Sequence, residues 1–85
     1  MANNIIPPLV LADDQTFRRQ FNNFVRRRHL SIPEWKDKEI EVGWKSTVQL
    51  DGTPIGEGTA RSKGGAREIA ASEAFQYLIN KYGNV

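Results

Sequence analysis

The sequence predicts an α+β domain in which one helix is followed by three antiparallel strands and a second helix, with both helices packed on one face of the sheet. Three patterns predict this order. Phenylalanines recur at helical spacing near the start, apolar and polar residues alternate between residues 40 and 50, and alanines recur every four residues near the end. A chain of 85 residues allows one small domain. We expect a flexible apolar arm over residues 1–12 and the folded domain over residues 13–83.

The first helix is predicted over residues 14–29, where Asp13 or Asp14 can cap the first turn. Its apolar side chains lie at helical spacing and form a face for the core: Phe17, Phe21, Phe24 and Val25. A neighbouring polar stripe is either an ordinary solvated face or a contact surface, and it consists of Thr16, Gln20, Asn23 and Arg27. Pro33 ends any helical continuation.

Three strands are expected next. A short strand over residues 35–38 is followed by a turn and by a long strand that ends at Leu50, and Gly43 is a candidate for a bulge or a tight turn. One parity of this segment is assigned to the core side: Ile40, Val42, Trp44, Ser46, Val48 and Leu50. The other parity faces water and includes Glu39 and Glu41. The dipeptide Asp51-Gly52 predicts a hairpin into a third strand over residues 55–60.

The second helix is expected to begin after a Ser62 cap and to run to about Lys81, with Gly83 as its stop. Gly56 and Gly58 are expected to let this helix approach the third strand closely, because its buried face is rich in alanine. The predicted core contains Phe17, Phe21, Phe24, Val25, Leu30, Trp35, either Val42 or Trp44, Val48, Leu50, Ala66, Ile69, Ala70, Ala74, Phe75 and Leu78.

The residue content argues against catalysis. The chain has no cysteine, its single histidine, His29, follows three arginines at a helix end, and no P-loop or nucleotide fingerprint occurs. We therefore expect no enzyme activity, no cofactor and no metal ion. The lack of cysteine fits an intracellular protein, for which we expect the cytoplasm and leave the nucleus open. The apolar run over residues 5–12 is too short to span a bilayer and lacks the basic flank of a signal peptide, so no membrane is expected as a partner.

The formal net charge is only +2, but the cations are clustered. Five arginines and no acid occur between residues 18 and 28, and three cations and no acid between residues 61 and 67. In the second cluster a capping serine and two glycines precede a helix, and a helix start of this kind attracts anions. Phosphate is the expected ligand at this helix start.

The segment GEGTARSKGGAREIAASEAF resembles the C-terminal half of the double-stranded RNA-binding domain family. That family has a G-x-G strand, a Ser-Lys-Lys-x-Ala-Lys helix start and a following run of alanines. Arg67 stands for the last lysine of that start and Gly64 replaces the middle one. The residues that match directly are Ser62, Lys63, Ala66, Ala70, Ala71, Ala74 and Phe75. The resemblance extends over residues 14–82 and implies the same fold and a duplex RNA partner.

The resemblance also implies roles for individual residues. Gln20 and Asn23 would touch 2′-hydroxyls or base edges in a minor groove, with Thr16 and Arg27 beside them. At the second helix, phosphate contacts are implied for Lys63 and Arg67, with Arg61 and the Gly64 amide nearby. The first inter-strand loop lacks the family's Gly-Pro-x-His segment and is shortened, so Lys36 and Lys38 are left as replacement phosphate contacts.

A second interpretation stays open from the sequence. The shortened loop, the glycine at position 64, the modest net charge and the apolar arm also suit a module for protein–protein interaction or dimerisation on the same fold. Its partner would be a second copy of the chain or another protein.

Overall fold

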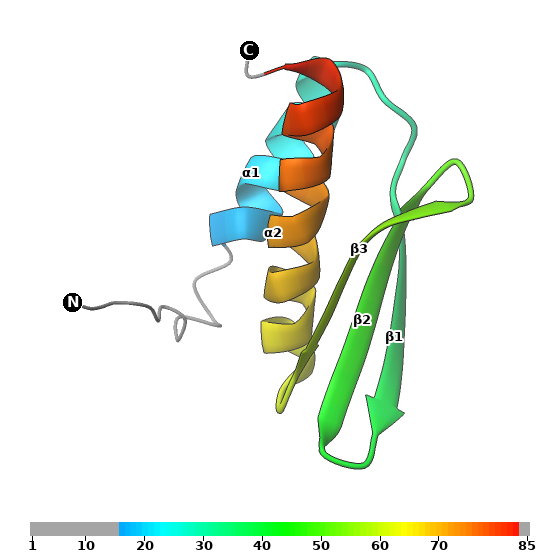
Figure 1. Ribbon diagram of the computed structural model, residues 1–85, viewed down its shortest axis with the longest axis vertical. Helices are drawn as coiled ribbons and strands as arrows, with labels where there is room; N and C mark the ends of the chain where they lie inside the picture. Colours follow the sequence, from blue (N-terminus) through cyan, green and yellow to red (C-terminus); the bar gives the residue numbers. More distant parts are fainter. Residues whose placement is uncertain (1–15, 84–85) are drawn as a thin grey trace, which may run out of the picture.

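The computed structural model describes residues 16–83 and confirms the predicted fold class (Figure 1). The three strands form one antiparallel sheet in the order β1-β2-β3, and both helices lie side by side on one face of it. In chain order the elements are α1 (Thr16–Arg27), β1 (Glu34–Ile40), β2 (Gly43–Leu50), β3 (Thr53–Ala60) and α2 (Lys63–Tyr82). The arm and its boundary with the domain, like the cap expected from Asp13 or Asp14, lie outside the described residues.

The connection between β1 and β2 differs from the prediction. The first strand is longer than residues 35–38 and continues to Ile40, which pairs with Gly43 across the two-residue turn Glu41-Val42. Val42 is therefore 76% exposed in the turn, so of the two alternatives Val42 and Trp44, Val42 is not the core residue. The backbone turns at Gly43 with φ +148°, and a Cβ there would lie 2.3 Å from the carbonyl oxygen of Ala60. Only glycine fits this position without a shift of the backbone.

The strand register determines which side chains meet the helices. Trp35 pairs with Val48, which pairs in turn with Gly56, and Asp37 pairs with Ser46, which pairs with Gly58. Both rows face the helices, because Trp35 contacts Phe21 of α1 and Asp37 bonds to α2. The predicted parity is correct from Trp44 onward, but the two-residue turn places Ile40 on the opposite face.

The β2–β3 hairpin turns at Asp51-Gly52, as predicted. Both residues have positive φ angles, 54° and 81°, as a two-residue primed turn requires. The third strand begins at Thr53, two residues before the predicted start, and includes Pro54. Proline is tolerated there because β3 is an edge strand and its pairing with β2 shifts register beside Gln49.

The close approach of α2 to β3 is confirmed. A Cβ on Gly56 would lie 2.3 Å from the carbonyl oxygen of Ala70, and one on Gly58 would lie 2.6 Å from that of Ala66. The alanines that face these glycines are fully buried. The helix ends as expected at Gly83, whose N–H donates to the Ile79 carbonyl over 2.8 Å.

The core lies between the helices and the sheet. Its buried apolar residues are Phe21, Phe24, Val25, Val48, Ile55, Ala66, Ala70, Ala71, Ala74 and Leu78, with Leu30, Trp35, Leu50 and Phe75 packed partly buried against them. Two further predicted core residues are exposed, Phe17 by 41% and Ile69 by 48%. Phe17 lies in the first turn of α1, where its N–H donates to Glu68, and the Cβ of Ile69 lies next to Gly58 of the edge strand β3.

Helix α1 ends at Arg27, two residues before the predicted end. The His29 N–H donates to the Arg26 carbonyl over 3.1 Å, and the Leu30 N–H donates to the Val25 carbonyl over 3.0 Å. His29 adopts a left-handed conformation with φ 55° and is exposed, as expected for a residue that follows a helix. Neither of the two described helices has a stretch long and apolar enough to cross a membrane.

Candidate nucleic-acid interface

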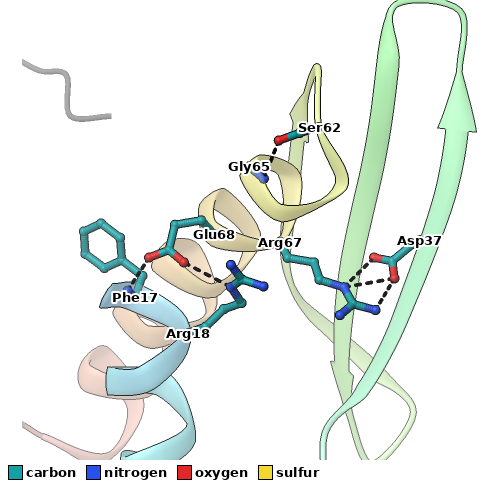
Figure 2. A network of polar contacts seen from close by, with 7 residues as sticks. All are labelled: Phe17, Arg18, Asp37, Ser62, Gly65, Arg67 and Glu68. Atoms are coloured by element: carbon teal, nitrogen blue, oxygen red, sulfur yellow. Dashed lines mark hydrogen bonds and ion pairs between the residues drawn. The ribbon is translucent and has the colours of Figure 1, made fainter. Parts of the chain in front are cut away.

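The start of α2 is capped as the sequence predicts. The Ser62 hydroxyl accepts a hydrogen bond of 2.9 Å from the Gly65 N–H (Figure 2), and the Ser62 carbonyl accepts the Ala66 N–H. In the described part of the chain, the amides of Lys63 and Gly64 have no protein acceptor. Unpaired amides at a helix start carry partial positive charge, so this end of α2 favours an anion.

Two exposed cations accompany this helix start. Lys63 begins α2, and its ammonium lies 4.9 Å from the centre of the Trp44 ring on β2. Arg61 precedes the cap and is exposed. Among residues 16–83 neither of these side chains forms an ion pair, although the Lys63 charge helps to lower the pKa of Asp37. Both charges therefore remain available to an anion from solution.

Arg67, which the resemblance assigns to phosphate, is bound inside the domain. Its Nε donates to both carboxylate oxygens of Asp37 at 3.2 and 3.0 Å, and its Nη2 also donates to Asp37 (Figure 2). The buried Ser46 hydroxyl donates to the same carboxylate over 2.6 Å, and the guanidinium lies over the Trp35 ring. Arg67 holds the pKa of Asp37 below its ordinary value, and Ser46 adds to this against the opposing effect of burial. This network joins α2 to β1.

A second carboxylate holds the start of α1. Glu68 is buried on α2, and it accepts the Phe17 N–H and the Arg18 Nε, the latter over 3.1 Å (Figure 2). It supplies an acceptor for one of the amides that a helix start leaves unpaired. The sequence analysis missed this role because the two partners are 50 residues apart in the chain. The Arg18 Nη2 also lies 3.8 Å from where a Cβ of Gly64 would be, so the starts of the two helices are neighbours.

The exposed surface of α1 is broader than the predicted stripe. Gln20, Asn23 and Arg27 are exposed as expected, and Thr16 is half-buried. The buried face of the helix is narrow, so three further residues that the sequence analysis did not select are also exposed: Arg19, Asn22 and Arg26. Within the described residues, Arg19, Arg26 and Arg27 form no ion pair, and α1 contains no acid. The outer face of α1, defined as Arg19, Asn23, Arg26 and Arg27, is therefore cationic.

Lys36 and Lys38 are not brought together with these residues. They are exposed on β1 and alternate with Trp35 and Asp37, which face the helices. Successive side chains of a strand point to opposite faces. Both lysines consequently lie on the face of the sheet that carries no helix, away from Lys63. The Glu41-Val42 turn is even shorter than expected and adds an acid and an exposed apolar side chain instead of a cation.

In residues 16–83, no three His, Cys, Asp or Glu side chains are grouped in a way that could hold a metal ion. No protein-family model matches the sequence, and no curated protein matches it.

Proposed function

We propose that this chain is a double-stranded RNA-binding domain that binds duplex RNA by its shape and without catalysis. The observation that carries the proposal is the charge on two neighbouring helix segments. The outer face of α1 and the start of α2 present five cations that form no ion pair in the described chain: Arg19, Arg26, Arg27, Arg61 and Lys63. The hydrogen bonds from the Phe17 N–H and the Arg18 Nε to Glu68 join the starts of the two helices.

Duplex RNA suits this arrangement of cations. An A-form duplex has a deep, narrow major groove, so proteins contact its phosphates and the 2′-hydroxyls of its shallow minor groove. In the proposed complex the outer face of α1 lies in a minor groove, where Asn23 and Gln20 can donate to and accept from 2′-hydroxyls. The start of α2 meets the phosphates that border the adjacent major groove. Little sequence preference is expected from contacts of these kinds.

The proposed complex has two contact regions rather than three. The β1–β2 connection is a two-residue turn, and the lysines of β1 face away from the helices. The footprint should therefore be shorter than the ~16 base pairs that such domains span with three regions. With two or three phosphates neutralised, the logarithm of the binding constant should fall with the logarithm of salt concentration at a slope of about −2 to −3.

The test is a titration of a fluorescent duplex RNA of about 20 base pairs, a length chosen to exceed the expected footprint. Single-stranded RNA and duplex DNA of the same sequence serve as competitors at two salt concentrations. We expect duplex RNA to be bound in preference to both. Lys63→Glu should abolish most binding, because it reverses a charge at the phosphate contact.

The matched control is Lys81→Glu, which makes the same change of net charge at the opposite end of α2, where Lys81 contacts Tyr77 and Tyr82. It should bind duplex RNA nearly as the wild type does. Equal losses in the two variants would mean that net charge, and not the start of α2, governs binding. Normal binding of duplex RNA by Lys63→Glu would mean that the start of α2 is not part of the RNA interface.

A module for protein interaction is the second candidate function. It is favoured by Ile32 and Val42, which are 87% and 76% exposed, and by the internal pairing of Arg18 and Arg67. Sedimentation over a range of concentrations separates the candidates. A concentration-dependent dimer that dissociates when residues 1–12 are removed would support a second copy of this chain as the partner, whereas a monomer with salt-sensitive RNA binding would support the RNA-binding proposal.

A further inference from the structure

Arg67 and Lys63 lie one helical turn apart at the start of α2, yet their surroundings differ. Lys63 is exposed over Trp44 and forms no ion pair in the described residues. Arg67 is bound through two of its nitrogens to Asp37. The side chain of Asp37 is only 12% exposed, while that of Arg67 is still 35% exposed. The guanidinium is thus accessible from solution, but its Nε–H and one N–H of Nη2 are already bound to Asp37, which also neutralises its charge.

The occupying group resembles the proposed ligand. A carboxylate and a phosphate both accept a guanidinium through a pair of oxygens, so the donors that serve Asp37 cannot serve a phosphate at the same time. Ser46 is fully buried and holds one oxygen of Asp37, and the Trp35 ring lies beneath the guanidinium. These contacts fix the carboxylate in place, so Arg67 does not exchange partners by a simple side-chain rotation of Asp37.

We infer that Asp37 is an internal competitor for phosphate, which occupies Arg67 and thereby lowers the affinity of the RNA site. The inference rests on the proposed function, and it makes Asp37 a determinant of affinity that touches no RNA itself. In the wild type the start of α2 binds phosphate through Lys63 and Arg61. Removal of the Asp37 charge releases the Arg67 guanidinium, which then supplies one further phosphate contact from the same helix face.

Asp37→Asn tests the inference, because asparagine keeps the oxygen that accepts from Ser46 and removes the charge. We expect duplex RNA to bind on the order of fivefold more tightly at low salt, and the salt slope to steepen by about 0.9, the value for one phosphate. The matched control is Glu39→Gln, which removes the same charge from an exposed position of the same strand. It should change the affinity by less than about twofold, because Glu39 forms no ion pair with an arginine in the described chain.

Arg67→Gln gives an independent measurement that does not depend on how Asp37→Asn folds. Since Arg67 holds no phosphate in the proposed wild-type complex, its loss should leave the salt slope unchanged. A modest fall in affinity is expected, because Asp37 is then unpaired beside Lys63, whose charge already helps to lower the pKa of Asp37. In the double variant Asp37→Asn/Arg67→Gln the gain should disappear. A salt slope shallower by about 0.9 in Arg67→Gln alone would show that Arg67 already binds a phosphate and would overturn the inference.

The remaining outcomes are distinguishable from a failure of the proposed function. If the wild type binds duplex RNA and folded Asp37→Asn binds no more tightly, the competition by Asp37 is overturned and the RNA-binding proposal stands. If neither the wild type nor any variant binds duplex RNA, the proposed function is overturned and this inference falls with it. Circular dichroism of each variant establishes that the compared proteins are folded.

Discussion

Helix α2 is attached to its neighbours by two different kinds of contact. Toward β3 it is held by close packing, where Gly56 and Gly58 lie under the backbone of a helix face made of alanines. Toward β1 and α1 it is held by two charged pairs, Arg67 with Asp37 and Glu68 with Arg18. The packed side depends on the absence of side-chain atoms and is insensitive to pH. The charged side depends on two ion pairs, and in one of them Arg67 holds the pKa of Asp37 below its ordinary value.

The largest expected effect comes from a change on the packed side. Gly56→Ala places a Cβ 2.3 Å from the Ala70 carbonyl oxygen and 2.8 Å from the Ala74 nitrogen, so the helix must move away from the sheet. We expect the free energy of unfolding to fall by about 3 kcal/mol or more, at the upper end for an overpacked core. Urea denaturation followed by far-UV circular dichroism measures the loss. A loss below about 1 kcal/mol would show that the backbone of β3 shifts easily and that close packing does not anchor α2.

A smaller, pH-dependent effect is expected on the charged side. The folded protein lowers the pKa of Asp37 below its ordinary value of 3.8, so the folded state binds fewer protons at this site than the unfolded state. The stabilisation from this pair is therefore complete above the unfolded pKa and is lost as the pH falls through the folded pKa. At pH 7, Asp37→Asn should lower the free energy of unfolding by about 1–2 kcal/mol, discounted because the Arg67 side chain is 35% exposed.

Urea denaturation of wild type and Asp37→Asn at a series of pH values measures this dependence. The difference between the two proteins isolates Asp37, because the other carboxylates are common to both. We expect the difference to stay constant from pH 7 down to the ordinary pKa of 3.8 and then to shrink as the pH falls further. A difference that persists well below the unfolded pKa would mean that the neutral hydrogen bonds, and not the charge, carry the stabilisation.

The difference between the packed and the charged side of α2 also explains which parts of the structure could be predicted from the sequence. The packed side was predictable because its signals are local: the Ser62 cap, the Asp51-Gly52 hairpin and the glycines of β3 each act within a few residues. The charged side was not, since Arg67 and Asp37 are 30 residues apart and Arg18 and Glu68 are 50 apart, with no periodicity to connect them. The β1–β2 turn escaped prediction because a two-residue turn leaves the alternation of apolar residues unbroken.

Some residues of the candidate site could likewise be placed from the sequence and others could not. The exposure of Gln20, Asn23, Arg27 and Lys63 follows from helix position alone and was predictable. That Arg67 is bound to Asp37, and that Lys36 and Lys38 face away from the helices, depends on strand register. A register shift by one residue would exchange the two faces of β1, so these placements required the three-dimensional arrangement.

Gly64→Ala gives the smallest expected change in stability. It distinguishes a glycine that close packing requires, such as Gly56, from one that has space for a side chain. Unlike Gly56, it leaves space for a side chain, because the nearest atom to an added Cβ is the Arg18 Nη2 at 3.8 Å. Gly64→Ala should raise the free energy of unfolding by about 0.5–1 kcal/mol, since alanine reduces the entropy of the unfolded chain without strain in the helix. The same urea denaturation measures this gain. A loss of stability would mean that the space beside the Arg18 guanidinium does not accommodate a methyl group, and that the charged side of α2 is packed as tightly as the side that faces β3.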